Sequence, residues 1–292
     1  MDFEKFLKQH NLMNYAAGLT GCRSSSNCSF NHCDYDITVF DNKSDSESII
    51  HFGNDLVCLH HGSLDESNSK ILVQYAQMQI LQDSSWELKI FLSKIKDKRS
   101  ELILDNAKNC LIDAMLQSQK CLVGIGTDIF ASCWQKCASF SLADAICLLN
   151  GHCPSSSHTL DMMRKFEKNP INEAISTVNE TSGIERATPS LLERMFKSTI
   201  GFSDFVNKTR FSKIMQKKYD FFIKNSMLAD CYFYLGNTNK ENFLQIKNVL
   251  TRKPELIHIL KIALDIESDP MLLSQHSKNI QKACKELLVN LV

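Results

Sequence analysis

Two short segments near the N-terminus contain residues that can bind phosphate groups and a metal ion. Residues 21–25 read Gly-Cys-Arg-Ser-Ser, and Asp34 and Asp36 begin an apolar run that extends to Phe40. Alternate residues of a strand point to the same face, so the two carboxylates are expected to project together. Paired carboxylates can hold Mg²⁺ against a nucleoside triphosphate. The spacing therefore predicts a site for a magnesium–nucleotide complex.

The elements that must position these residues are predicted to form a small sheet. A stripe of Phe3, Phe6 and Leu7 favours a short amphipathic helix over residues 2–11. Gly53 and Asn54 separate two apolar runs and can take positive φ, which indicates a hairpin. The expected strands cover residues 15–20, 37–40, 48–52, 56–60 and 78–81.

The spacing of apolar residues becomes helical after Trp86 and stays so to the end of the chain. The pattern therefore predicts an α+β protein, in which a small mixed sheet with flanking helices is followed by an all-helical domain. We expect an α/β domain over residues 1–100 and a helical domain, which could bind an acceptor substrate, over residues 101–292. One helix is expected over residues 128–150, followed by Gly151, and another over 219–235, which stops at Gly236. Further helices are expected to begin at Ser157, Pro189, Pro254 and Pro270.

Composition and charge limit the classes of partner. Lys and Arg together number 33, as do Asp and Glu, so no global basic field attracts a long nucleic acid. No apolar run reaches the roughly 20 residues that span a bilayer, and the N-terminus lacks the apolar core of a signal peptide. We therefore expect a cytoplasmic protein without a membrane partner.

The chain has twelve cysteines, and most of them lie inside apolar helical patterns. Reduced, buried thiols are the expected state, because a cytoplasmic protein keeps few disulfides. The cluster of Cys22, Cys28, His32 and Cys33 could suggest zinc, but it lacks the paired C-x2-C spacing typical of zinc sites.

The glycine turn, the gap that follows Cys22 and the Asp-Tyr-Asp-Ile run beginning at Asp34 resemble the signature of the nucleotidyltransferase superfamily, which has a DNA polymerase β-like fold. The matching motif covers about twenty residues, and the order of strands and helices extends the likeness to about a third of the chain. The helical region around residues 142–158 is similar in style to the substrate domain of the antibiotic-type members. The resemblance implies transfer of a nucleoside monophosphate to an acceptor hydroxyl, with release of pyrophosphate.

The resemblance also implies a role for each residue of the motif. Asp34 and Asp36 would coordinate Mg²⁺ or Mn²⁺, with a nucleoside triphosphate, expected to be ATP, as co-substrate. A small molecule or a protein is the expected acceptor. The residues that would bind the nucleotide phosphates are Gly21, Cys22, Arg23, Ser24 and Ser25.

The third carboxylate of the superfamily has no clear counterpart in this sequence. The expected strand over residues 56–60 contains none in its interior, Asp55 lies at its start, and Asp83 follows the last strand. Asp83 is the predicted third catalytic residue. Its uncertain position, together with a cysteine at position 22 where the superfamily has Ser or Gly, leaves two alternatives open. One is a nucleotidyltransferase fold that serves as a catalytically inactive binding or regulatory module. The other is an unrelated helical interaction protein in which the aspartate pair is coincidental.

Overall fold

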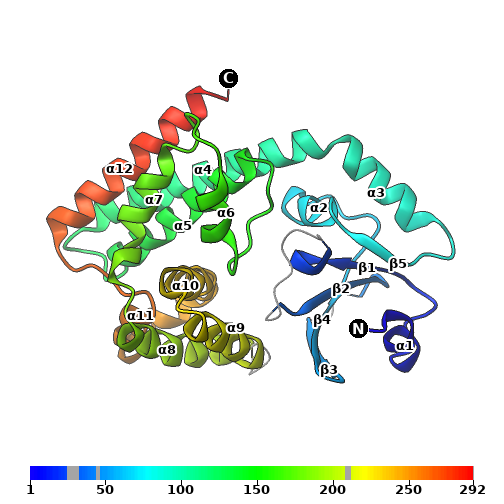
Figure 1. Ribbon diagram of the computed structural model, residues 1–292. Helices are drawn as coiled ribbons and strands as arrows, with labels where there is room; N and C mark the ends of the chain where they lie inside the picture. Colours follow the sequence, from blue (N-terminus) through cyan, green and yellow to red (C-terminus); the bar gives the residue numbers. More distant parts are fainter. Residues whose placement is uncertain (25–32, 44–46, 208–211, 292) are drawn as a thin grey trace. The chain divides into compact units, whose positions relative to one another are not determined.

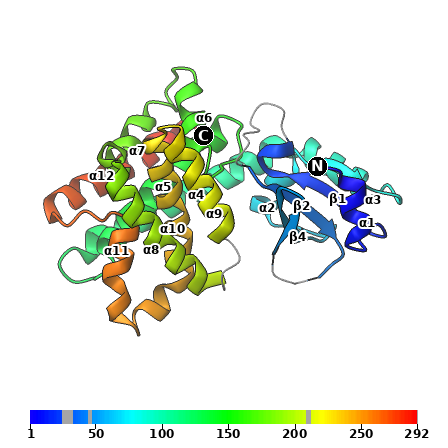
Figure 2. The same cartoon turned by 60° about the horizontal axis from the view of Figure 1, so that its bottom comes forward.

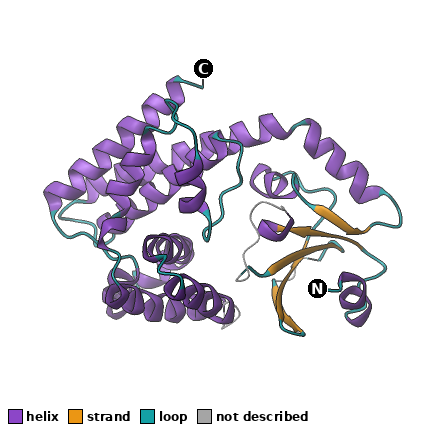
Figure 3. Cartoon of the chain, viewed as in Figure 1, coloured by secondary structure: helices purple, strands orange, loops and turns teal. Residues whose placement is uncertain are grey.

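The structure of the protein is a computed structural model that describes residues 1–24, 33–43, 47–207 and 212–291 (Figure 1). The chain divides into two compact units, Met1–Asp105 and Asn106–Val292. The division falls inside helix α4 (Arg99–Gly124), five residues beyond the expected boundary at residue 100. Figure 3 shows that the strands drawn all belong to the first unit and that the described part of the second unit is helical. The protein is therefore of the α+β class.

The first unit contains a mixed five-stranded sheet with the order β3-β4-β2-β1-β5. β2 and β4 are parallel, whereas the other neighbouring strands are antiparallel. All five strands had been predicted to within two residues at each end. Their bounds are β1 Ala16–Thr20, β2 Tyr35–Phe40, β3 Ser48–Phe52, β4 Asp55–His61 and β5 Gln79–Gln82.

Alternation along β2 decides which residues face each side of the sheet. Ile37 and Val39 pack into an apolar cluster with α1 (Phe3–Gln9), while Phe40 packs with α2 (Ser69–Tyr75) and α3 (Glu87–Asp97). Figures 1 and 2 show these helices on opposite faces of the sheet. Because Asp36 alternates with Ile37, it lies on the face that α2 and α3 cover.

The second unit is a bundle around two buried helices, α5 and α10 (Figure 2). Almost every residue of α5 is buried, which explains why its sequence is apolar on all sides. A proline begins α8, and Asp269 caps the N-terminus of α12 as a proline follows it. The helices of this unit, after α4, are α5 Ala131–Leu149, α6 Thr159–Lys165, α7 Ala174–Ser182, α8 Pro189–Asn207, α9 Ser212–Lys224, α10 Leu228–Leu250, α11 Ile257–Ala263 and α12 Pro270–Val289.

The predicted helix over residues 219–235 is wrong at both ends. The helical conformation is interrupted between α9 and α10, where Ser226 has φ of +56°. Helix α10 then continues through Gly236. Gly236 is not a helix terminator. It makes room for the ring of Phe140, because a Cβ at position 236 would lie 2.3 Å from Phe140 Cζ. The sequence alone could not reveal this contact, since the partner lies on another helix.

The expectation of reduced cysteines is met among the described residues. The eleven described cysteines are all free thiols, and the five inside the predicted helical patterns are buried, namely Cys133, Cys137, Cys147, Cys231 and Cys284. No helix of the described chain combines the length and apolar character that a membrane crossing requires. Cys28 lies outside the described residues.

The contact between Gly236 and Phe140 predicts opposite effects for two glycine substitutions in helices. Gly236→Ala should lower the free energy of unfolding by about 1–3 kcal/mol, because the new methyl group overlaps the buried ring. Gly201→Ala is the matched control. Nothing lies within 4 Å of its added Cβ, so it should raise the free energy of unfolding by up to about 1 kcal/mol. Chemical denaturation followed by circular dichroism measures both, and equal effects would contradict this packing.

Candidate functional site

The predicted glycine turn and the second predicted aspartate are in direct contact. Thr20, the last residue of β1, pairs with Asp36 of β2, and the 3-10 turn Gly21–Ser24 follows immediately. Gly21 has φ of +69°, and a Cβ there would lie 2.1 Å from Asp36 Oδ2. The glycine is therefore needed twice, for its left-handed backbone and for the space that the carboxylate fills.

The two aspartates lie at the N-terminal end of β2. Asp34 lies two residues before Asp36 and one residue before β2, and it is 8% exposed. The Asp36 side chain is 28% exposed, and its backbone carbonyl accepts a hydrogen bond of 3.2 Å from Thr20 Oγ1. A partly accessible carboxylate on a rigid strand can bind a ligand without a large rearrangement.

The other residues of the turn make contacts that hold its shape. Arg23 donates from Nε and Nη2 to the carbonyl of Cys33, at 3.3 and 3.0 Å, and its guanidinium lies 4.6 Å from the centre of the Tyr35 ring. Ser24 Oγ donates to the carbonyl of Gly21 at 2.8 Å. Arg23 thus ties the start of β2 to the turn, a role that the sequence did not suggest.

Cys22, the remaining described residue of the predicted phosphate-binding set, lies in the same turn and is half-buried. Ser25 lies outside the described residues, as do Cys28 and His32 of the upstream cysteine–histidine cluster.

The strand beside β2 brings a thiol and an imidazole to Asp36. In the parallel pairing of β2 with β4, Asp36 aligns with Cys58, and His60 lies two residues further along the same face. His60 Nε2 is 3.5 Å from Asp36 Oδ1, and its Nδ1 is 3.2 Å from Glu47 Oε1. Burial lowers the pKa of His60, but hydrogen bonds to Asp36, Cys58 and Glu47 outweigh this effect and raise it to about 12. His60 is therefore a cation at neutral pH in the ligand-free protein.

The adjacent histidine, His61, contacts Asp41 and not Asp36. His61 Nδ1 lies 3.0 Å from both carboxylate oxygens of Asp41, whose side chain is fully buried. The two rings therefore have different partners, as expected for adjacent residues of a strand.

Sequence reasoning missed Glu47, Cys58 and His60 as site residues. Period-two spacing places Cys58 and His60 on one face, but only the parallel register shows that this face adjoins Asp36. Glu47 directly precedes β3, whose first residue pairs with Leu59.

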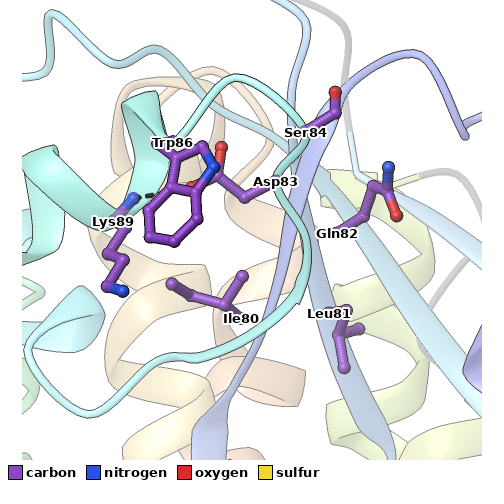
Figure 4. Close-up of a pocket in the computed structure, with 7 residues that line it drawn as sticks. All are labelled: Ile80, Leu81, Gln82, Asp83, Ser84, Trp86 and Lys89. Carbon is purple, nitrogen blue, oxygen red and sulfur yellow. Dashed lines mark hydrogen bonds between the residues drawn. The ribbon is translucent and has the colours of Figure 1, made fainter.

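The structure does not bring Asp83 to the aspartate pair, which corrects the expectation for the third carboxylate. Gln82 pairs with Ala17, so Asp83 lies about 13 Å along the strands from the level of Asp36. Its carboxylate accepts hydrogen bonds from the backbone N–H groups of Leu88 and Lys89 at the start of α3. Figure 4 shows Asp83 beside Trp86 and Lys89, in a cavity of about 310 Å³ at this junction.

The donor set around Asp36 suits Mg²⁺ only in part. Asp36 supplies carboxylate oxygens, and a nucleotide-bound Mg²⁺ needs only one or two carboxylates because phosphates and waters complete its shell. The facing positions on β4 are a thiol and an imidazole, which Mg²⁺ does not favour. The residues present therefore fit one nucleotide-bound ion, but β4 places no carboxylate opposite Asp36, because its Asp55 lies three residues before Cys58.

Comparisons with known protein families and with curated proteins found no match to this chain.

A second polar cluster lies within the helical unit, around the buried Lys136 of α5. Its Nζ donates to the carbonyl of Ser182 at 2.6 Å and to Tyr232 Oη at 3.0 Å. Burial, reinforced by the nearby charge of Arg186, lowers the pKa of Lys136 to about 7. Lys136 and Arg186 also line a cavity of about 270 Å³. The apolar pattern of α5 gave no sign of this cluster.

The contact between Gly21 and Asp36 predicts that alanine substitutions at two positive-φ glycines will lower the free energy of unfolding by different amounts. Gly21→Ala should lower the free energy of unfolding by about 1–3 kcal/mol more than Gly53→Ala. Both positions have left-handed backbones, but the space around Gly53 is open, so the difference isolates the overlap with Asp36. Urea denaturation of both variants measures it, and equal losses would show that Asp36 does not rest on the turn.

The lowered pKa of Lys136 predicts a pH dependence of stability. Between pH 7 and 8.5 the unfolded chain holds a proton on this lysine that the folded protein has released, so stability rises with pH. The slope is at most about 1.4 kcal/mol per pH unit. Lys136→Met should flatten the curve in this range, whereas the exposed control Lys282→Met should leave it unchanged. Denaturation curves at several pH values test this, and an unaltered slope in Lys136→Met would refute it.

Proposed function

We propose that the first unit binds a nucleoside triphosphate with Mg²⁺ or Mn²⁺ and transfers its nucleotidyl group to an acceptor hydroxyl. The observation that carries the proposal is the packing of the Gly21 turn against the Asp36 carboxylate. A glycine turn beside a strand carboxylate would place phosphate-binding backbone N–H groups and a metal-binding carboxylate within one small volume.

The two aspartates and Arg23 have different parts in this proposal. Asp34 and Asp36 would hold the divalent ion, which supplies charge neutralisation for the triphosphate when it is bound. Arg23 keeps the turn fixed to the start of β2, so the groups around Asp36 are preorganised. The acceptor hydroxyl would attack the α-phosphate and pyrophosphate would leave.

The identity of β4 residues favours a second candidate, a nucleotide-binding module without transfer activity. Transfer requires a group that accepts the proton of the attacking hydroxyl. His60 stands beside Asp36 on the neighbouring strand, and a group with a pKa of about 12 is already protonated at neutral pH. A protonated imidazole cannot serve as that base, but its positive charge can attract a triphosphate.

Labelled nucleotides test the first candidate. The full chain is incubated with each α-³²P-labelled nucleoside triphosphate and Mg²⁺ or Mn²⁺, and label is sought on protein, RNA and small molecules. Asp36→Asn should lower transfer by roughly 100-fold or more, because a charge that stabilises the transition state is lost. Asp55→Asn, at the start of the same sheet's β4, is the matched control and should retain transfer.

Calorimetry separates the two candidates. Binding of ATP with Mg²⁺ that Asp36→Asn weakens, without any transfer of label, would support the binding module. Transfer that survives in Asp36→Asn would contradict the proposed mechanism. Absence of both binding and transfer for all four nucleotides would overturn both candidates.

A further inference from the structure

Three different metal-binding side chains converge on one point of the sheet. One ligand atom from each of Asp36, Cys58 and His60 can be chosen so that all lie within 4.8 Å of one another. Cys58 and His60 share a face of β4, and Asp36 is the register partner of Cys58 on β2. All three therefore project from paired strands, which hold ligands more rigidly than loops do.

We propose that Asp36, Cys58 and His60 form a binding site for a transition-metal ion of the zinc class. Thiolate, imidazole and carboxylate are the ligands that Zn²⁺ takes in proteins. Three protein ligands leave a fourth tetrahedral position for water or for an anionic ligand.

The separation of two of the three ligand atoms fits this coordination. Zinc–ligand bonds of 2.0–2.3 Å in a tetrahedron imply about 3.3–3.8 Å between neighbouring ligand atoms. The distance between Asp36 Oδ1 and His60 Nε2 is 3.5 Å.

Glu47 contacts the ring nitrogen of His60 that does not face Asp36. Its Oε1 lies 3.2 Å from His60 Nδ1, so the ring can donate its Nδ1–H to Glu47 while Nε2 faces Asp36. A carboxylate on the far nitrogen of a metal-binding histidine fixes the tautomer and the ring orientation. Metal binding would release the proton that Nε2 carries and the proton of the Cys58 thiol.

This site shares Asp36 with the nucleotide proposal, but it differs from that proposal in its chemistry and does not depend on it. A thiol and an imidazole select against Mg²⁺, whereas the predicted magnesium site uses only carboxylates. It is also separate from the upstream cysteine–histidine cluster considered in the sequence, because Cys58 and His60 belong to β4.

Cobalt substitution tests the site without nucleotide. The full-length protein is stripped with a chelator, reduced, and titrated with Co²⁺ alone. One equivalent should produce the visible bands of a tetrahedral ion and a thiolate-to-cobalt charge-transfer band, and Zn²⁺ should abolish both. A large excess of Mg²⁺ should leave them unchanged.

Matched variants assign the ligands. Cys58→Ser should remove the charge-transfer band, and His60→Gln should abolish stoichiometric binding. Glu47→Gln should weaken Zn²⁺ binding by about 10- to 100-fold. His61→Gln and Cys153→Ser are the controls and should bind as the unaltered chain does. Circular dichroism of each variant, together with its thermal midpoint with and without Zn²⁺, identifies any variant that does not fold.

The proposal is overturned if Co²⁺ gives no tetrahedral spectrum in the unaltered chain. It is equally overturned if folded Cys58→Ser and His60→Gln keep the spectrum, because other thiols would then be the ligands. Neither result depends on nucleotidyl transfer, so failure of the metal site and failure of the proposed function remain distinguishable.

Discussion

The carboxylate of Asp36 is the point where three strands and one turn constrain each other. β1 delivers the left-handed Gly21 against its Oδ2, β2 carries it, and β4 places His60 Nε2 3.5 Å from its Oδ1. A larger residue at position 21 would displace the carboxylate, and a shift of one residue between β2 and β4 would put His60 on the opposite face. The geometry of the site is therefore a consequence of strand register and of one missing side chain.

Electrostatics around Asp36 decide what chemistry this geometry can support. His60 lies between Asp36 and Glu47, and the two carboxylates keep it charged although it is half-buried. This fixed cation compensates the acidic groups in the absence of ligand. A nucleotide-bound Mg²⁺ and a thiolate-binding metal would both need Asp36, so the two would compete for one carboxylate. Zinc would then act as an inhibitor of any magnesium-dependent reaction at this turn.

The helical unit follows a different constraint, the close approach of two helices that are buried on nearly all sides. Gly236 of α10 allows contact with the Phe140 ring of α5, and Phe233 packs edge-to-face against the same ring with centroids 5.0 Å apart. The same interior buries Lys136, whose hydrogen bonds to Ser182 and Tyr232 offset the loss of water. Apolar packing and a polar network thus share one core, and the network contains the ionisable groups that could take part in chemistry.

Local sequence determined the strands, the positive-φ turn at Gly53, the capped start of α12 and the proximity of Gly21 to Asp36, because each depends on neighbouring residues or on short spacing. The sequence placed the end of a helix at Gly236, which is wrong. The glycine at this position makes room for the ring of Phe140, which lies almost a hundred residues away in the sequence. Asp55 lies at the start of one predicted strand and Asp83 follows another, and Asp83 was chosen as the third carboxylate because strand order cannot be read from spacing alone. Only the tertiary structure decided that β4 lies beside β2 in parallel register, which put Cys58, His60 and Glu47 around Asp36 and carried Asp83 to the far end of the sheet.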